Sequence, residues 1–140
     1  MRSSCFSLAT TFVLAGVLFA PAAFPCTTFL AQHEGQPVFG KNYDWDQGAG
    51  FVLTNPRGLQ KASLILSPQD VSATWTSKYA SLTFNQYGVE FPNSGINEKG
   101  LTIEIMALDS TTYPAPDSRP VVNELQWIQY ALDNFASVEE

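Results

Sequence analysis

Short apolar runs separated by turn signals fill most of the chain, and this pattern constrains the fold more than any other feature. The runs are rich in β-branched and aromatic residues, which favour strands, and Gly, Pro, Asn or Asp bounds them. The predicted strands are residues 26–31, 37–45, 51–54, 62–66, 81–86 and 101–108. The predicted turns are residues 33–36, 55–58, 68–70, 92–95 and 97–100.

The period of the apolar residues changes near the C-terminus. Leu125, Ile128, Leu132 and Phe135 recur at spacings of three and four residues, which predicts one helix over residues 122–135. A run of strands followed by a helix is typical of an α+β fold. Ser-x-x-Glu at residues 137–140 resembles a capping box, which begins a second helix. Because that helix would begin where the sequence ends, we expect residues 26–140 to be the N-terminal part of a longer domain.

The first 25 residues have the layout of an export signal. Met1 and Arg2 give a positive start, residues 5–20 are apolar apart from Ser and Thr, and small residues with two prolines follow. A transmembrane helix needs about 20 continuous apolar residues, so this stretch is too short to span a membrane. We therefore expect residues 1–25 to be a signal peptide plus a short pro-segment. The processed protein would be secreted or periplasmic, with no stable membrane span.

The cleavage position decides the state of Cys26. The A-x-A pattern fits residues 20–22, and a cut there leaves a stub of three residues, 23–25, that a second step must remove. Direct cleavage before Cys26 and lipidation of Cys26 both fit less well, because Pro25 precedes it. Removal of residues 1–25 also removes Cys5, so the mature chain cannot form an internal disulfide. The remaining thiol is then either reactive or paired between molecules.

The charges of the chain argue against several kinds of partner. Thirteen acidic and seven basic residues give a formal net charge of −6, and no run of Lys or Arg occurs. The chain therefore lacks the electrostatic signature of a protein that binds nucleic acid or an anionic membrane. No further ligands cluster with Asp44 and Asp46, so we expect neither a metal nor another cofactor.

A cysteine that becomes the first residue carries its own base. Its α-amine has a pKa of about 7.7–8.0 and its thiol one of about 8.5, so the amine can accept the thiol proton near neutral pH. The one histidine, His33, falls in a predicted turn, where we expect a solvated side chain rather than a catalytic base. The alternatives for Cys26 are an inert buried thiol and a lipid anchor.

Three segments together resemble the choloylglycine hydrolase and penicillin V acylase family of N-terminal-nucleophile hydrolases. They are residues 26–29 (CTTF), 38–45 (VFGKNYDW) and 97–101 (NEKGL). The resemblance spans residues 26–140. It implies the N-terminal portion of a four-layer αββα sandwich, in which two antiparallel sheets lie face to face with helices outside.

The resemblance also implies roles for individual residues. Cys26 matches the nucleophile, and Asp44 matches the acid that orients the α-amine. Lys41 stands where the family usually has Arg near the thiolate, and a lysine is a more mobile charge than the arginine fork. Ala107 stands where the family has an oxyanion-hole Asn, so only its backbone N–H could donate there. The alternatives are a surface charge for Lys41 and a solvated strand end for Asp44.

The strand pattern limits how Lys41 and Asp44 can both act. In a regular strand, Lys41 and Tyr43 share one face and Asn42 and Asp44 share the other. Both Lys41 and Asp44 can point toward Cys26 only if a bulge or an early strand end occurs near Tyr43.

Trp45, Trp75 and Trp127 are expected in the core.

The resemblance implies an enzyme that hydrolyses linear, non-peptide amide C–N bonds, as bile-salt hydrolases and penicillin V acylases do. Its substrate would be a small-molecule amide with a bulky apolar acyl group, although the sequence does not identify which amide. Family members are often homotetramers, which is compatible with a homo-oligomer. The alternatives are an exported β-rich binding protein, a lipid-anchored envelope protein, or an inactive truncated remnant. We expect the 140 residues alone to be inactive, because a missing second half would leave sheet edges bare.

Overall fold

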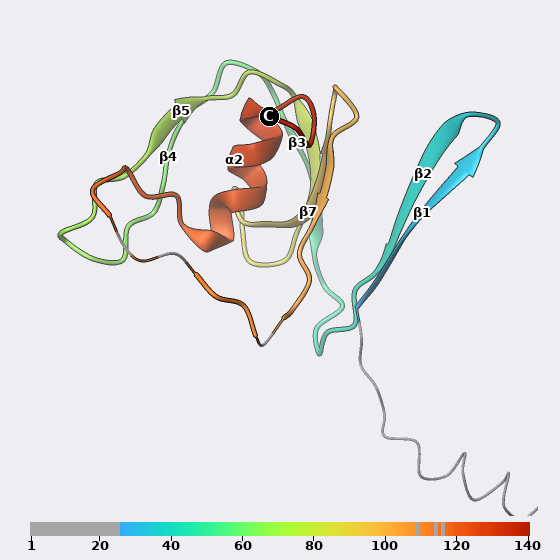
Figure 1. Cartoon of the computed structure of the whole chain (residues 1–140), viewed down its shortest axis with the longest axis horizontal. Helices are drawn as coiled ribbons and strands as arrows, with labels where there is room; N and C mark the ends of the chain where they lie inside the picture. Colours follow the sequence, from blue (N-terminus) through green and yellow to red (C-terminus); the bar gives the residue numbers. More distant parts are fainter. Residues whose placement is uncertain (1–25, 109, 114, 116) are drawn as a thin grey trace, which may run out of the picture.

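The computed structural model describes residues 26–108, 110–113, 115 and 117–140 (Figure 1). The expected signal segment, residues 1–25, lies outside the described residues. The elements are strands β1 (Thr27–His33), β2 (Gln36–Asn42), β3 (Phe51–Asn55), β4 (Gln60–Ala62), β5 (Thr74–Thr76), β6 (Ser81–Asn85), β7 (Pro92–Asn97) and β8 (Thr102–Glu104), the 3-10 helix η1 (Glu124–Gln126) and helix α2 (Trp127–Asn134).

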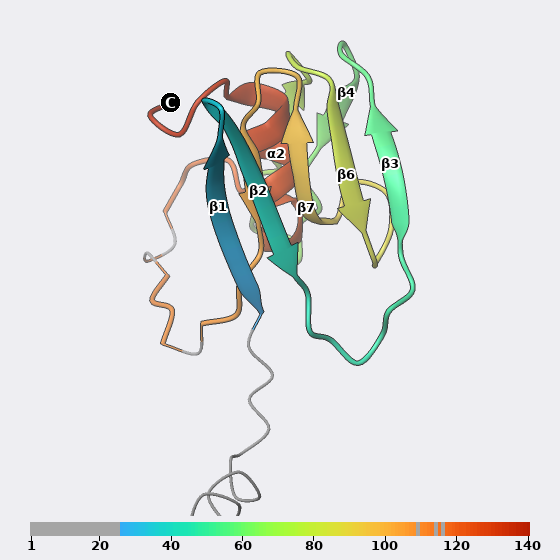
Figure 2. The same ribbon diagram turned by 90° about the vertical axis from the view of Figure 1, so that its right-hand side faces the viewer.

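Within the described residues, the strands form three antiparallel sheets. The largest has the order β3-β6-β7-β8, while β1 pairs with β2 and β4 pairs with β5. Helix α2 lies between the β4–β5 pair and one face of the four-stranded sheet, and the β1–β2 hairpin lies on the other face (Figures 1 and 2). The structure is thus mostly sheet with one short helix. It is compatible with part of the sandwich that the resemblance implies.

The sheet face that meets α2 is largely polar. On β6 the side chains of Ser81, Thr83 and Asn85 are buried, whereas those of Leu82 and Phe84 point to the opposite, more exposed face. Buried polar groups need hydrogen-bond partners, and Asn55 Nδ2 of β3 accordingly donates to Thr83 Oγ1 at 3.0 Å. The apolar face of this sheet is therefore the one that the hairpin covers.

Helix α2 approaches the sheet closely at Gly95 of β7. A Cβ atom on Gly95 would lie 2.7 Å from Leu132 Cδ1 and 2.8 Å from the Leu82 carbonyl oxygen. Real Cβ atoms do not come this close to other heavy atoms, so only glycine fits here. Leu132 is fully buried, and Ile128 and Ala131 of the same helix are also buried. The predicted helical face is confirmed at Ile128 and Leu132, whereas Leu125 is exposed and Phe135 is only half-buried.

Asp133 joins α2 to the β4–β5 pair. Its Oδ2 accepts a hydrogen bond from the Trp75 indole at 2.7 Å and lies 3.0 Å from Lys61 Nζ. Its Oδ1 accepts from Gln129 Nε2 at 2.9 Å. Asp133 and Gln129 have no exposed surface. This charged group is stable in the interior because each oxygen has a donor.

The segment predicted as the turn 97–100 also anchors the end of α2. Asn97 Nδ2 donates to the carbonyls of Leu132 at 2.9 Å and Phe135 at 2.7 Å. Asn97 Oδ1 accepts from the backbone of Lys99 and Leu101, and Gly100 has a φ of 87°, which favours glycine. The turn prediction is confirmed, and its first residue links the turn to the helix.

Residues 92–95, predicted as a turn, belong to the central strand β7. The prediction was wrong because these turn-forming residues meet strand requirements here. Pro92 takes the first position of the strand, where proline is tolerated, and Gly95 admits the helix.

Several other boundaries also differ from the predictions. The predicted strand 62–66 is replaced by β4, which ends at Ala62, because the Leu64 backbone N–H donates to Gln126 Oε1 at 2.6 Å instead of joining a ladder. The predicted strand 101–108 shortens to β8, and β5 was not predicted. Residues 136–138 form a bend, and Glu140 accepts from the Ala136 N–H at 2.7 Å. The helix expected to begin at residues 137–140 stays a prediction.

Candidate active site

The β1–β2 hairpin brings Cys26 to the open end of a short ladder. Its two-residue turn has Glu34 at φ 49° and Gly35 at φ 78°, the left-handed pair that fits a tight hairpin. The ladder runs from His33 opposite Gln36 at the turn to Thr27 opposite Asn42 at the other end. Cys26 precedes this last pair and Tyr43 follows it. Cys26 is half-buried and has a free thiol.

His33 lies at the end of β1 farthest from Cys26. The strand has seven residues, and at about 3.3 Å per residue the two ends are about 20 Å apart. His33 is exposed. It therefore cannot act as a base for the Cys26 thiol in this conformation.

Strand β2 ends at Asn42 rather than at Trp45 as predicted. An early strand end near Tyr43 is one of the two conditions under which both Lys41 and Asp44 can point toward Cys26, because in a regular strand they lie on opposite faces. Asn42 Nδ2 donates to both carboxylate oxygens of Asp44, at 2.9 and 3.1 Å, and Asp44 is half-buried. Within the described residues, the hydrogen bonds of the Asp44 carboxylate come from Asn42 and none comes from Cys26.

Lys41 reaches across to β8. Its ammonium lies 3.0 Å from Glu104 Oε2 and donates to the Ile105 carbonyl at 2.5 Å. It also lies 4.9 Å from the centre of the Tyr43 ring, a cation–π contact. Lys41 is therefore not a free surface charge, and among the described residues its ion pair is with Glu104.

Tyr43 links Cys26 to the four-stranded sheet. Burial raises the pKa of its phenol above the ordinary 10.0, Tyr87 raises it further, a hydrogen bond from Asn93 opposes this, and the Cys26 charge adds a smaller increase. Tyr43 Oη also donates to Gln86 Oε1 at 3.3 Å. Cys26 thus stands across from Tyr43 at the open end of the ladder.

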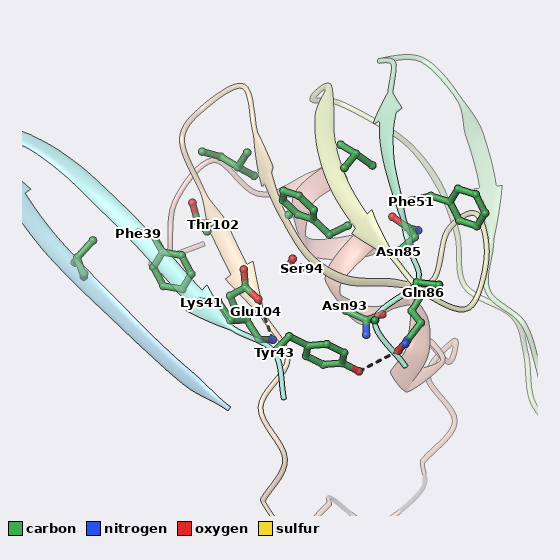
Figure 3. A pocket seen from close by; sticks show the side chains of 18 of the residues that line it. Phe39, Lys41, Tyr43, Phe51, Asn85, Gln86, Asn93, Ser94, Thr102 and Glu104 are labelled. Atoms are coloured by element: carbon green, nitrogen blue, oxygen red, sulfur yellow. Dashed lines mark hydrogen bonds and ion pairs between the residues drawn. The ribbon is translucent and has the colours of Figure 1, made fainter. Parts of the chain in front are cut away.

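A cavity of about 1050 Å³ lies between the hairpin and the apolar face of the four-stranded sheet (Figure 3). We call it the hairpin cavity. Its hairpin wall includes Leu30, Phe39, Lys41 and Tyr43, and its sheet wall includes Phe51, Val52, Phe84, Asn93, Ser94, Ile96, Thr102 and Glu104. Apolar side chains with a few polar groups at one end are typical of small-molecule sites. Cys26 does not line the cavity itself, but its neighbour Tyr43 does.

The remaining expectations concern Ala107, the tryptophans and metal ligands. Ala107 is exposed beyond the end of β8 and carries no side-chain amide. Of the three tryptophans expected in the core, Trp75 is buried, whereas Trp45 and Trp127 are 58% and 54% exposed.

Within the described residues, no group of three or more His, Cys, Asp or Glu side chains could hold a metal ion. None of the helices in these residues is long and apolar enough to cross a membrane.

Sequence reasoning missed Glu104, Gln86 and Asn93, because they come from segments far from Cys26 along the chain. One signal was available for the hairpin wall. Phe39 and Lys41 alternate along β2, Tyr43 continues the alternation directly after the strand, and the structure brings all three to the cavity.

Comparison with known proteins places this geometry in a family. Residues 26–140 match the model of the linear amide C–N hydrolases, choloylglycine hydrolase family. The penicillin V acylase of Pectobacterium atrosepticum is 28% identical over 139 residues, an alignment that covers 91% of this chain and 36% of that protein. The chain therefore spans about a third of the length of this relative. On the family match, the chain belongs to the choloylglycine hydrolase family of linear amide C–N hydrolases.

Proposed function

We propose that this chain carries the nucleophile and part of the acyl-binding cavity of an exported cysteine amidase that hydrolyses linear amide C–N bonds. The observation that carries the proposal is the position of Cys26. It stands at the open end of the hairpin ladder, beside Tyr43, which lines the hairpin cavity. The family match also begins at Cys26. Removal of residues 1–25 would make Cys26 the first residue and free its α-amine.

The freed α-amine supplies the base for this reaction. It accepts the thiol proton of Cys26, and the thiolate sulfur then attacks the amide carbonyl carbon. The C–N bond breaks, the amine product leaves with the proton from the α-ammonium, and a thioester remains on Cys26. A water molecule then gives a proton to the α-amine and attacks the thioester. The C–S bond of the thioester then breaks. The products are a carboxylic acid and, with the proton from the α-ammonium, the free Cys26 thiol.

Asp44 and Lys41 complete the proposed site on the hairpin. The Asp44 carboxylate holds the α-amine in place, and the hydrogen bonds from Asn42 fix the orientation of that carboxylate. Lys41 is the cation of the cavity wall. Ala107 offers only its backbone N–H, so the oxyanion would need donors from elsewhere in the protein.

The cavity wall suggests the class of substrate. Apolar side chains dominate both walls, among them Leu30, Phe39, Val52 and Phe84. They favour a bulky apolar acyl group over a charged one. The relative named penicillin V acylase agrees with an amide of this kind, so a penicillin V-like acyl amide is the first substrate to test.

The stacking order supports the larger fold that we propose for the whole protein. Helix α2, the four-stranded sheet and the hairpin follow one another as successive layers (Figure 1). These would be the outer helix layer and the start of the two facing sheets of an αββα sandwich. The remaining strands of the second sheet would pair with the hairpin, and a homo-oligomer is part of the same proposal.

The test combines N-terminal analysis with two substitutions. Intact mass and N-terminal sequence of the exported protein should show Cys26 as the first residue. We expect Cys26→Ala to abolish amidase activity and Cys26→Ser to reduce it strongly, while Cys5→Ser, a change in the removed segment, leaves it intact. Undiminished activity in Cys26→Ala would overturn the proposal. So would a mass increased by a diacylglycerol, because Cys26 would then be a lipid anchor.

A further inference from the structure

A nearly buried ion pair joins the two walls of the hairpin cavity. The Lys41 ammonium and Glu104 Oε2 are 3.0 Å apart, and the two side chains expose only 8% and 11% of their surfaces. Figure 3 shows the pair between β2 and β8. Burying one charge without the other is costly, so each side chain depends on its partner. Lys41 also donates to the carbonyl of Ile105, the residue that follows Glu104 at the end of β8.

Among the described residues, no ladder joins the hairpin to the four-stranded sheet. In this part of the chain β1 and β2 pair with each other, and all seven residues of β1 are exposed. Side chains on one face of the hairpin must therefore hold it. The Tyr43 bond to Gln86 is long, at 3.3 Å, whereas Lys41 and Glu104 form a nearly buried ion pair at 3.0 Å. Within the described residues Glu104 Oε2 makes no hydrogen bond, so the contact is ionic, and attraction between charges this buried is screened little by salt.

The ion pair lies close to the end of the hairpin that bears Cys26. Lys41 is opposite Thr28 in the ladder, two residues from Cys26. Its ammonium also touches the Tyr43 ring, and Tyr43 is the residue across the ladder end from Cys26. A shift of Lys41 would therefore move both the backbone next to Cys26 and the aromatic ring beside it.

We infer that Glu104 is a positioning residue, which holds Lys41 and thereby fixes the Cys26 end of the hairpin against the sheet wall of the cavity. The inference rests on the proposed function, because it concerns a reaction of the Cys26 thiol. It gives Lys41 a different task from the thiolate-stabilising cation that the family resemblance implies. An ammonium whose charge is balanced by Glu104 has little net field left for the thiol.

Four proteins test this inference in the processed full chain: the parent, Glu104→Gln, Lys41→Met and the double variant. For each, kcat and KM are measured on an apolar acyl amide, and the thiol is titrated by its rate of alkylation with iodoacetamide as pH rises. We expect each single variant to lower kcat by about 10- to 100-fold, because small displacements of a reacting group cost this much. KM should change much less. The double variant should be no worse than the poorer single variant, because both charges are gone.

The titration separates positioning from thiolate activation. If Lys41 positions the hairpin, the pH midpoint of alkylation should be nearly the same in all four proteins. If Lys41 instead activates the thiol, Glu104→Gln frees a cation, lowers the midpoint and leaves activity equal to or above that of the parent. That result would overturn the inference, and so would a double variant as active as the parent. Asp117→Asn, which breaks an exposed ion pair with Arg119, is the matched control and should change nothing.

The inference and the proposed function can fail separately. An inactive parent or an active Cys26→Ala variant overturns the amidase proposal. Hydrogen exchange of the hairpin then still tests whether the Lys41–Glu104 ion pair holds the hairpin to the sheet. In that measurement the backbone amides of β1 and β2 should exchange faster in the double variant than in the parent. The double variant leaves no lone charge buried, so it should fold even if a single variant does not. Equal exchange in the two proteins overturns the inference about Glu104 alone.

Discussion

The hairpin and the helix–sheet core depend on side chains in opposite ways. In the core, polar groups such as Asp133 and Gln129 are fully buried and bonded to several neighbours. In the hairpin, all residues of β1 are exposed, and contacts from Lys41 and Tyr43 hold the two strands to the sheet. Regions with few buried contacts open at low cost, while core elements open only on global unfolding. The comparison teaches that stability is concentrated around α2, whereas the residues of the proposed reaction lie on the weakly held hairpin.

The largest effect on stability should come from Asp133→Asn in the core. The change leaves Lys61 buried without a compensating charge, because Lys61 Nζ lies 3.0 Å from Asp133 and is almost fully buried. Removing one partner of a buried pair costs about 3–5 kcal/mol. Urea denaturation should show this loss of unfolding free energy. In Asp117→Asn, where the pair is exposed, the change should be within about 0.5 kcal/mol. Equal losses in both variants would contradict the distinction between core and surface charges.

A smaller loss is expected from Gly95→Ala at the contact between α2 and β7. The added Cβ would meet Leu132, Leu82 and Thr83 at 2.7, 2.8 and 2.9 Å. Overpacking of this kind costs about 1–3 kcal/mol. Thermal unfolding should therefore occur at a lower temperature, with the rate of Cys26 alkylation below the transition unchanged.

Gly48→Ala is the matched control for this substitution. Nothing lies within 4 Å of a Cβ at Gly48, which belongs to the loop after the hairpin. Its thermal unfolding should therefore match that of the parent. If Gly95→Ala unfolds at the parent temperature as well, the close approach of α2 to β7 is not required.

The parts of the fold that the sequence could predict are those with a local pattern, and the parts it missed depend on contacts between elements distant in sequence. The helix over residues 122–135 and the strand over 81–86 were both found, the strand close to its predicted bounds as β6. Helix α2 begins only at Trp127, after the 3-10 helix η1. Strand β7 could not be predicted, since its glycine, Gly95, is required by contacts with Leu132 and Leu82, which are distant in sequence. A local pattern thus indicates that an element forms but not what covers each face, and on β6 the face that meets α2 is polar.

The proposed site shows a similar division. The hairpin motif placed Cys26, Lys41 and Asp44 near one another, and the local contact of Asp44 with Asn42 agrees with their short separation. The partner of Lys41 is Glu104, which lies on β8. No local pattern could indicate this pair, because it exists only when the hairpin folds over the sheet. The thiolate role of Lys41 is implied by the family resemblance and stays a prediction.

The smallest effect is expected from Tyr43→Phe, which tests the hairpin without touching the core. At neutral pH, loss of the bond to Gln86 should cost about 1 kcal/mol or less. The pKa of the Tyr43 phenol is raised in the folded protein, mainly by burial, above its ordinary value of 10.0. The contribution of the neutral phenol is therefore fully present below pH 10.0 and is lost as the pH rises through the raised pKa. Alkaline pH should thus loosen the hairpin of the parent.

Hydrogen exchange gives the measurement for this last prediction. In the parent, the protection of the β1 and β2 amides, after correction for the intrinsic rate, should decline above pH 10.0, while that of the α2 amides stays constant. Tyr43→Phe should show a smaller decline than the parent, because it has no phenol proton to lose while the Lys41–Glu104 ion pair is still present. Tyr113→Phe removes an exposed phenol and should behave like the parent. If protection falls equally in the hairpin and in α2, the two regions open together, and the hairpin is not the weaker part of the molecule.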